Sequence, residues 1–263
     1  VSRSMKELVT SLDLALPGKN LDVAASAVTQ ARKRLGEAPL EWLFRLTGNI
    51  WGLRSARTHD WRGLSVLGMD MSTLRVPDSQ ENRDTFGGQS PDAKRGASGY
   101  PLVRMVSMMV LRSHLVLATR VGPWKGSSEI SLARELIEDM PEDALMILDR
   151  GYLNWAFLSG IERRQGNRHW LTRASKRTNW KVISHQGTGD FIIELKVSSK
   201  ARKMDPSLPE TLWCRALHYQ RKGFQPQVIL TSLLSPSEFP AQEVAKLYHE
   251  RWEIELGFGE VKT

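Results

Sequence analysis

The stretch YHERWEIELGFGEVKT, residues 248–263, determines how the rest of the chain is interpreted. It contains no proline, and its apolar residues recur at helical spacing, which predicts an amphipathic α-helix. Because each residue turns about 100° around a helix axis, polar groups of different chemistry share one narrow stripe, formed by Tyr248, Arg251, Glu255 and Lys262. The stripe borders the expected core face of Leu247, Ile254, Phe258 and Val261, whereas Glu253 and Glu260 point to the opposite side. A surface helix with ordinary ion pairs has the same pattern, so the rest of the chain has to distinguish the two interpretations.

Composition restricts the class of protein. The 263 residues are 41% hydrophobic and 25% charged, which is typical of a globular chain, and no apolar run is long enough to span a membrane. The single Cys214 excludes an internal disulfide, and no Cys/His cluster has zinc spacing, so we expect a reducing, cytoplasmic setting. The net charge of +8 favours a polyanionic partner such as nucleic acid. The chain begins at Val1 and ends inside a predicted helix, so we expect it to be part of something longer.

The first 60 residues have helical patterns. Residues 22–36 combine a candidate N-cap, Asp22, with a Gly stop and a basic face. Such a helix either enters a DNA groove or is simply solvated. A second helix follows Pro39, and its large apolar residues are expected in the core: Trp42, Leu43, Leu46 and Trp51.

From Trp61 onward, strand patterns dominate. Two apolar runs, residues 63–70 and 144–149, each end on an aspartate, Asp70 and Asp149. If the two strands are parallel neighbours, their carboxyl ends share one sheet edge and the two acids converge, although either could simply cap a turn. The other elements expected here are a second short strand at 72–79, a polar loop at 80–99, a hairpin at 103–121 turning at His114, and helices at 128–140 and 153–164.

Residues 163–182 form the most basic run of the chain. Its cations have no acid among them: Arg163, Arg164, Arg168, Arg173, Lys176, Arg177 and Lys181. Trp170 and Trp180 interleave with them, and cations with indoles are the ingredients of nucleic-acid binding. Short strands and a polar turn at 198–209 then fill the chain to residue 234, before the last helix begins near Ala241. We therefore predict a β-rich insertion at about 171–234.

Three motifs together resemble one enzyme family. The spacing Tyr248-x2-Arg251-x3-Glu255-x6-Lys262 matches the Y-R-E-K signature of DDE transposases of the insertion-sequence-4 group. GMDMSTLRVPDS around Asp70 and ILDRGY around Asp149 resemble the family's two aspartate segments, and residues 25–44 resemble its N-terminal region. The resemblance implies an α/β, RNase H-like mixed sheet flanked by helices, with the β-rich insertion before the glutamate helix. It divides the chain into a helical DNA-binding region, residues 1–60, and a catalytic domain, residues 61–263.

The resemblance also implies a mechanism. Asp70, Asp149 and Glu255 would hold two Mg²⁺ ions, replaceable by Mn²⁺, since hard carboxylates suit these metals. The enzyme would nick double-stranded DNA at transposon ends, form a hairpin and transfer the freed strand into target DNA. Tyr248, Arg251 and Lys262 would bind phosphates near the cut, and the basic run adds Arg173, Lys176, Arg177 and Trp180 as DNA contacts. A homodimer in the DNA complex and a bacterial, nucleoid-associated setting follow from the same resemblance.

Two positions depart from the family pattern. Met71 stands where a small residue is usual, and Gln227 stands near the place of a tryptophan that stacks beside a flipped base, a role that Trp180 or Trp213 could take over. Two alternatives remain open from the sequence: an RNase H-like structure-selective nuclease that does not join strands, and a truncated regulator that binds ends without cutting.

Overall fold

The computed structural model describes residues 25–88, 99–220 and 225–262. The predicted N-cap Asp22 lies outside these ranges. In the described part, one mixed sheet has the strand order β3-β2-β1-β4-β5-β9-β8-β7-β6. Its first half consists of β1 (Ser65–Arg75), β2 (Leu102–Val110), β3 (Leu115–Pro123), β4 (Ala144–Leu148) and β5 (Arg168–Arg173). β1, β2 and β3 are antiparallel, whereas β1, β4 and β5 are parallel. The predicted RNase H-like mixed sheet is confirmed.

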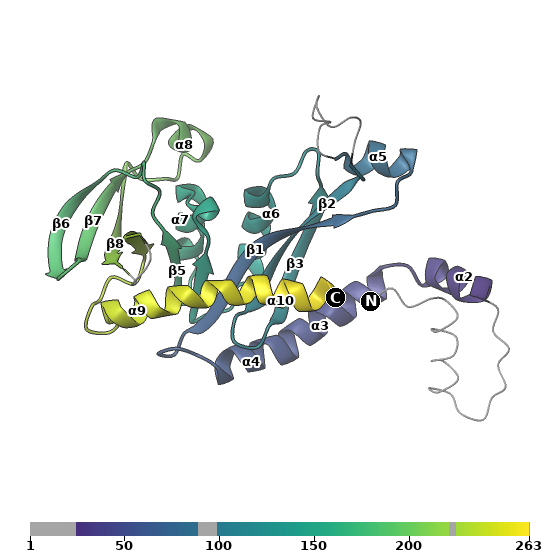
Figure 1. Cartoon of the computed structure of the whole chain (residues 1–263), viewed down its shortest axis with the longest axis horizontal. Coiled ribbons are helices and arrows are strands. Elements are labelled where there is room, and N and C mark those ends of the chain that lie inside the picture. The colour runs from purple at the N-terminus through teal and green to yellow at the C-terminus, as the bar shows by residue number, and fades with distance from the viewer. Residues whose placement is uncertain (1–24, 89–98, 221–224, 263) are drawn as a thin grey trace.

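Alternation along the strands creates a core on each face of the sheet. On β1, Leu67 and Met69 join one apolar cluster while Val66 joins the other. The first cluster is covered by α6 (Glu129–Leu136), the 3₁₀ turn η2 (Ile137–Asp139) and α7 (Trp155–Arg163). The second is covered by one long helical run, composed of α9 (Ala241–Leu247), the 3₁₀ turn η4 (Tyr248–Trp252) and α10 (Glu253–Lys262). Figure 1 shows this run crossing the sheet in front of β1. The predicted core residues Leu247, Ile254 and Phe258 are buried there.

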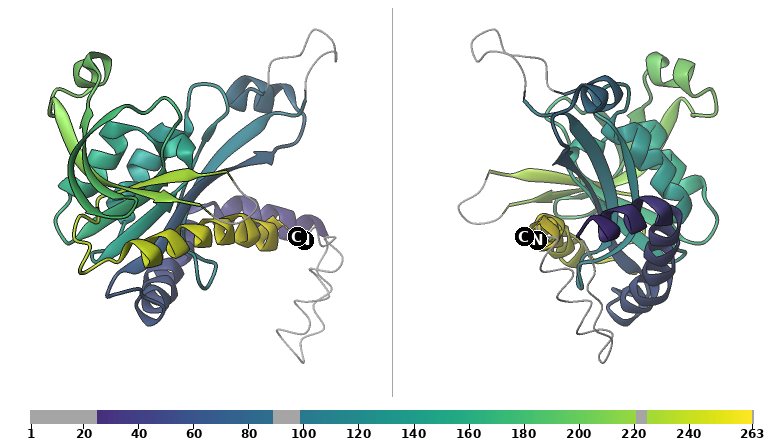
Figure 2. Two further views of the ribbon diagram at one scale, coloured as in Figure 1. Left: turned by 60° about the vertical axis from the view of Figure 1, so that its left-hand side comes forward. Right: turned by 90° about the vertical axis from the view of Figure 1, so that its right-hand side faces the viewer.

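The insertion extends the sheet. β6 (Trp180–Gly187), β7 (Asp190–Lys196), β8 (Thr211–Tyr219) and β9 (Gln227–Thr231) are antiparallel neighbours, and β9 pairs with β5. Figures 1 and 2 show these strands as a curved wing beside the helical layers. Buried inside it, Arg215 of β8 forms an ion pair with Asp190 of β7 at 2.6 Å and donates to the carbonyl oxygen of Phe239 at 2.6 Å. The insertion is thereby tied to the segment that enters α9.

Several local predictions were wrong, because short polar segments are helical. Residues 80–99 were predicted as a loop but include α5 (Gln80–Phe86), whose first turn is capped by Ser79. The polar turn at 198–209 contains α8 (Ser199–Met204), capped by Ser198. In both cases the serine hydroxyl accepts a hydrogen bond from a first-turn backbone N–H, which satisfies a group that the helix itself cannot. The expected second strand at 72–79 is no separate element, because β1 continues unbroken to Arg75.

The N-terminal region forms a helical arm, consisting of α2 (Ala25–Leu35), α3 (Ala38–Thr47), the π-helical turn η1 (Gly48–Gly52) and α4 (Leu53–Thr58). The prediction that Trp42 and Trp51 lie in the core is wrong: they are 64% and 61% exposed, and Leu43 and Leu46 are exposed as well. The face that meets the sheet instead carries Gly48 and Gly52, four residues apart. A Cβ on Gly48 would lie 2.5 Å from the Leu117 carbonyl oxygen, so the backbone approaches β3 where side chains are absent.

Candidate active site

Asp70 and Asp149 lie level with one another on neighbouring parallel strands. The β1–β4 register pairs Met69 with Leu148, and each aspartate is the next residue of its chain. Asp70 was predicted to end its strand, but β1 runs on to Arg75, because beyond Asp70 it still pairs with β2. The convergence therefore comes from β4 ending at Leu148, not from both strands stopping.

The environment of Asp70 disfavours its charge. Burial is the main cause that raises its pKa to about 6. The Met71 N–H donates a hydrogen bond of 2.8 Å to Asp70 Oδ1, which has the opposite effect on this pKa. The carboxylates of Glu129 and Glu255 raise the pKa further, and the Arg251 guanidinium lowers it. A carboxyl that resists ionisation beside other acids marks a place where a cation would be stabilised.

Glu255 is brought beside β1 by close packing of α10. A Cβ on Gly68 of β1 would lie 3.4 Å from Ile254 Cδ1, and a Cβ on Gly257 would lie 2.5 Å from Met109 Sδ. The glycine in α10 thus leaves room for the Met109 side chain where the helix meets β2. The Glu255 carboxylate is exposed and accepts a hydrogen bond of 3.1 Å from Arg251, whose guanidinium also stacks on Trp252 at 4.2 Å.

Glu253 and Glu260 turn away from this site. Both contact His114 at the β2–β3 turn, at 3.1 Å and 3.0 Å respectively. Burial lowers the pKa of His114, but the hydrogen bonds and charges of the two glutamates outweigh it and raise the pKa. Glu255 thus lies on a different side of α10 from Glu253 and Glu260, as the helical spacing predicted. The contacts of Glu253 and Glu260 with His114 hold α10 against the sheet.

Two residues near these acids, Tyr152 and Glu129, were not predicted from the sequence. Tyr152 ends the 3₁₀ turn η3 (Arg150–Tyr152) directly after Asp149 and is 1% exposed. Burial raises the pKa of its phenol, and the carboxylates of Glu129, Asp70 and Asp149 raise it further. The phenol is thus close enough to these acids for their charges to disfavour its ionisation. A glutamate in the first turn of a helix is common, so nothing in the sequence separates Glu129 from ordinary helix-end acids.

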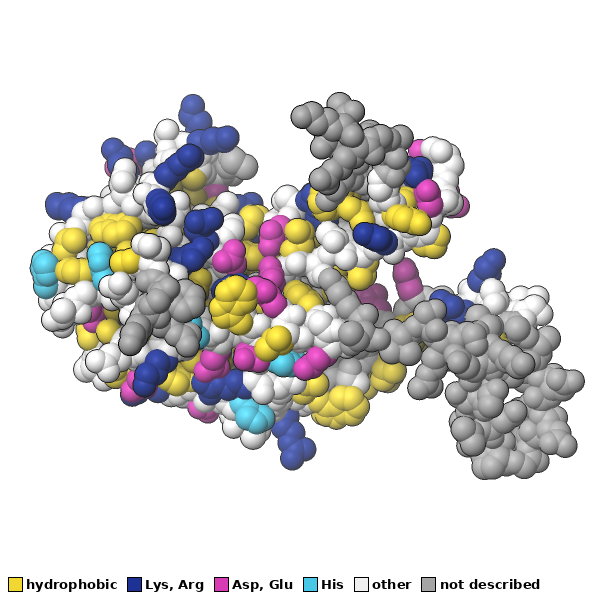
Figure 3. All heavy atoms as spheres, viewed as in Figure 1, with side chains coloured by type: hydrophobic (Ala, Val, Ile, Leu, Met, Phe, Trp, Pro, Cys, Tyr) yellow, Lys and Arg dark blue, Asp and Glu magenta, His cyan; other side chains and the backbone are white. Residues whose placement is uncertain are grey.

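A cleft of about 610 Å³ opens beside Asp149. It brings together three of the predicted DNA contacts, Arg173, Tyr248 and Arg251, with Asp149. Its remaining lining was not predicted as a site: Tyr219, Gln227, His249 and Trp252. Figure 3 shows acidic side chains gathered in the middle of this face, with Lys and Arg side chains next to them on the side of the insertion. The cleft thus joins cations and aromatic rings to the acidic group.

Other predicted DNA contacts lie apart from the cleft. Lys176 and Arg177 are exposed on the turn between β5 and β6, and Trp180 is half-buried against the main core. Lys262 ends α10, and its side chain lies outside the described part.

Two cations of the basic run already have acidic partners within the protein. Arg163 bonds to Asp205 and Arg164 to Glu138. Trp170 was predicted to interleave with the cations but is 2% exposed and donates its indole N–H to Glu162, so it belongs to the core.

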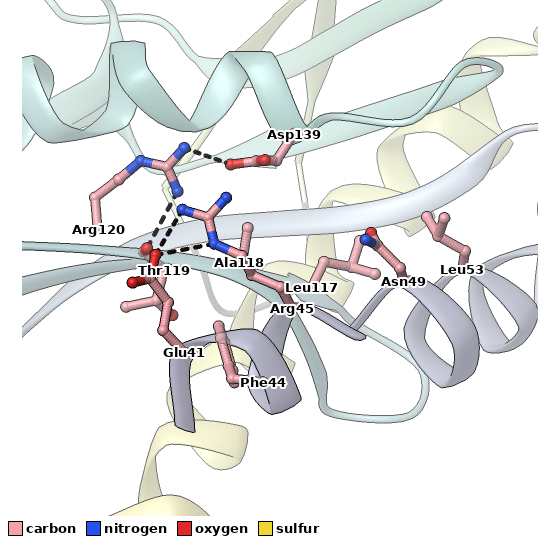
Figure 4. Close-up of a pocket in the computed structure, with 10 residues that line it drawn as sticks. All are labelled: Glu41, Phe44, Arg45, Asn49, Leu53, Leu117, Ala118, Thr119, Arg120 and Asp139. Carbon is pink, nitrogen blue, oxygen red and sulfur yellow. Dashed lines mark hydrogen bonds and ion pairs between the residues drawn. The ribbon is translucent and has the colours of Figure 1, made fainter. Parts of the chain in front are cut away.

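A smaller pocket, of about 100 Å³, lies between the N-terminal arm and β3 (Figure 4). Its charged groups are already paired: Arg45 with Glu41 at 2.8 Å, and Arg120 with Asp139 at 2.7 Å. This pocket is lined by polar groups where the N-terminal arm packs against the sheet, and it shares no lining residue with the acidic site.

The donor set at the acidic site suits a hard cation. Asp70, Asp149, Glu255 and Glu129 offer carboxylate oxygens, which Mg²⁺ and Mn²⁺ prefer. The side chains are not gathered tightly: within the described ranges, no three His, Cys, Asp or Glu groups converge closely enough to hold a metal ion. Glu255 instead faces Arg251. The residues present therefore fit the chemistry of a divalent metal, with Glu255 needing to leave its arginine partner.

Comparison with known proteins agrees with the resemblance. The family described as "Transposase DDE domain" matches residues 61–263, and that described as "Insertion element 4 transposase N-terminal" matches residues 1–45. This chain belongs to the DDE transposase family.

Two curated relatives from Escherichia coli K12 are similar to this chain. One is the transposase InsG for insertion sequence element IS4, 37% identical over 258 residues, which covers 98% of this chain and 57% of the relative. The other is the putative transposase InsZ, 35% identical over 183 residues, covering 68% of this chain and 58% of the relative. The chain therefore spans somewhat more than half the length of the relatives it matches.

A solved structure of a piggyBac transposase, in a synaptic complex with hairpin DNA, aligns with this chain at 9% sequence identity and a TM-score of 0.40. The alignment covers 73% of this chain and 39% of the piggyBac chain. A likeness at that level has no weight for function. Among the helices that the structure describes, none is long and apolar enough to cross a membrane.

Proposed function

We propose that this chain carries the DNA-cleaving and DNA-joining activity of a cut-and-paste transposase. The observation that carries the proposal is the level register of Asp70 and Asp149 on β1 and β4, with α10 holding Glu255 beside them. The net charge of +8 and the cationic side of the cleft support double-stranded DNA as the partner, both as transposon ends and as target.

Asp70, Asp149 and Glu255 would hold two divalent metal ions, Mg²⁺ or Mn²⁺. Such a pair supplies an activated attacking oxygen and stabilises the leaving oxygen of the phosphodiester. The three carboxylates would supply the negative charge that retains the metals beside a polyanionic substrate. The half-buried position of Asp70 limits competition from water.

The helix that carries Glu255 also prepares the phosphate site. Arg251 has five N–H donors in a planar fork, so it can release Glu255 and bind a phosphate, or contact both. Tyr248 is buried but lines the same cleft, and Trp252 adds an exposed indole, 56% exposed, on which a base could stack. Lys262, at the end of α10, would contact the same DNA strand.

The insertion and the N-terminal arm would extend the DNA contact. Arg173 lies in the cleft, and Lys176, Arg177 and Trp180 would follow the duplex away from the cut. Residues 1–60 would form the DNA-binding region and residues 61–263 the catalytic domain, interrupted by the insertion. A hairpin intermediate, a homodimer in the DNA complex and association with the bacterial nucleoid complete the proposal.

The decisive experiment follows the products of one reaction. The protein is incubated with Mg²⁺, labelled DNA bearing the ends of its own element, and a target plasmid. The proposal predicts nicked ends, hairpins and joined products, all lost in Asp149→Asn while DNA binding persists. Nicks without joining would indicate a structure-selective nuclease, and binding without nicks would indicate a non-catalytic regulator. Either result would overturn the proposal.

A further inference from the structure

One end of the insertion brings together parts of the chain that are separated in the sequence. The β6–β7 register pairs Trp180 with Leu195, so the beginning of β6 lies beside the end of β7. The helix α8 (Ser199–Met204) follows β7 after two residues. The side chains that begin β6, end β7 and form α8 are therefore neighbours at this end of the insertion.

This end of the insertion carries exposed lysines. The register sets Lys181 of β6 opposite Glu194 of β7, and Lys196 comes two residues after Glu194, so both lysines lie on one face of the sheet. On α8, Lys200 and Lys203 are three residues apart and form one stripe of the helix. We call these exposed residues the lysine surface: Lys181, Lys196, Lys200 and Lys203.

The lysine surface has no acidic partners of its own. Within the described ranges of the chain, none of its lysines forms an ion pair, whereas Arg202 of the same helix pairs with Glu210 at 3.0 Å. The carboxylate of Glu194, which lies opposite Lys181, accepts a hydrogen bond of 3.3 Å from the Trp213 indole. Clustered cations without counter-charges repel one another, so this surface favours the binding of a polyanion.

Positive charge continues from the lysine surface toward the cleft. Figure 3 shows Lys and Arg side chains over α8, and further ones between α8 and the acidic side chains in the middle of the same face. The turn between β5 and β6 leads from Arg173, in the cleft, to the beginning of β6, and it carries the exposed Lys176 and Arg177. Duplex DNA has one phosphate charge for about every 1.7 Å of its axis, so a line of cations matches its backbone.

We propose that the lysine surface is a second binding site for the phosphate backbone of duplex DNA, in addition to the cleft. The inference rests on the proposed function, because it takes DNA as the substrate and adds a surface that binds it. The lysine ammonium groups contact phosphate oxygens and release counterions from the duplex, without reading the base sequence. A transposon end and a target duplex have the same backbone, and the test distinguishes them.

The test measures the salt dependence of DNA binding by fluorescence anisotropy, in EDTA, so that the proposed metal site plays no part. Lys200→Ala with Lys203→Ala removes two phosphate contacts. The slope of log binding constant against log salt concentration should become shallower by about 1.8, since each contact contributes about 0.9. Raising the salt from about 50 to about 200 mM should therefore weaken DNA binding by the variant about 12-fold less than binding by the wild type.

Arg202→Ala is the matched control, because it removes a positive charge from the same helix. Its guanidinium already bonds to Glu210, so the slope should change by less than about 0.5. A change as large as that of each lysine would mean that net charge alone sets the slope, which overturns the inference. Lys200→Arg with Lys203→Arg keeps both charges and should keep the wild-type slope. Circular dichroism checks the folding of each variant, and Lys200→Gln with Lys203→Gln replaces the alanine variant if that one unfolds.

Two duplexes identify the DNA that the lysine surface binds. One bears the end of the element, and the other has an unrelated sequence and stands for the target. A shallower slope with the first alone assigns the surface to the transposon end, and with the second alone to the target. A shallower slope with both indicates general backbone binding. All three results support the inference, and an unchanged slope with both duplexes overturns it.

The outcome for this inference is distinguishable from the outcome for the proposed function. If the wild type cuts and joins DNA while the lysine variant keeps the wild-type slope, the lysine surface is rejected and the proposed function stands. If the wild type binds DNA without cutting it and the variant has the shallower slope, the lysine surface stands and the proposed function falls. Absence of DNA binding by the wild type would overturn both.

Discussion

Replacing the buried Arg215 tests how the insertion is joined to the catalytic helix. Arg215 and Asp190 are 0% and 4% exposed, and the guanidinium donates to both carboxylate oxygens, at 2.7 Å and 2.6 Å. Its third donor reaches the Phe239 carbonyl oxygen at 2.6 Å, in the segment that leads into α9. Arg215→Met would leave a carboxylate charged and unpaired in an apolar interior and would free that carbonyl.

The magnitude follows from this geometry. Breaking one side of a buried ion pair costs about 3–5 kcal/mol, and for a chain of this size each kcal/mol lowers the Tm by about 2–4 °C. We expect a fall in Tm of about 10 °C, measured by circular dichroism. The double variant Asp190→Leu with Arg215→Met should recover most of the loss, because no charge is left unpaired.

A matched control uses an exposed pair. Arg202 bonds to Glu210 at 3.0 Å, with side chains 34% and 82% exposed, so Arg202→Met should cost less than about 1 kcal/mol. Two results would contradict this expectation. The free energy of unfolding of Arg215→Met could lie within about 1 kcal/mol of the wild-type value, or the double variant could be as unstable as the single one.

Three further predictions concern the active site and its surroundings. Glu255→Gln should abolish DNA cleavage while Glu253→Gln leaves it nearly unchanged, and the reverse result in a nicking assay would reject the assignment of the two glutamates. The raised pKa of His114 means that its contacts with two glutamates stabilise the fold fully below pH 6.5 and lose this effect as the pH rises through the folded-state value. The Tm difference between wild type and His114→Gln should therefore narrow with rising pH, and a difference that widens would contradict it. Arg173→Ala with Lys176→Ala should make the slope of log binding constant against log salt concentration shallower by about two, since each phosphate contact contributes about 0.9. An unchanged slope would mean that neither residue contacts DNA.

The strands of the catalytic half could be predicted because both faces of the sheet are buried. The apolar runs that became β1 and β4 stand out from the polar turns around them, and the hairpin of β2 and β3 turns at His114 as expected. The level placement of Asp70 and Asp149 followed from a parallel arrangement that the sequence only suggested. The end of β1 could not be found, because its pairing with β2 beyond Asp70 is a long-range contact.

Tertiary contacts account for most of what the sequence did not predict. Trp42 and Trp51 carry an apolar pattern typical of a core face, yet the glycines of η1 offer a closer approach to β3 and leave the indoles exposed. Trp170 lies in a basic run but is buried, because β5 is the central strand between β4 and β9. Glu129 is distant in sequence from every recognised motif. Only the packing of α6 on β2 and β3 lets its charge raise the pKa of Asp70.

The most direct test of the central claim is a crystal structure of the protein soaked with Mn²⁺, with the metal located by its anomalous scattering. The claim predicts anomalous density between Asp70 and Asp149, with Glu255 turned from Arg251 toward the metal. The density should disappear in crystals of Asp149→Asn. Density elsewhere, or none at these carboxylates in a protein that still cuts DNA, would contradict the claim that these three acids form the metal site.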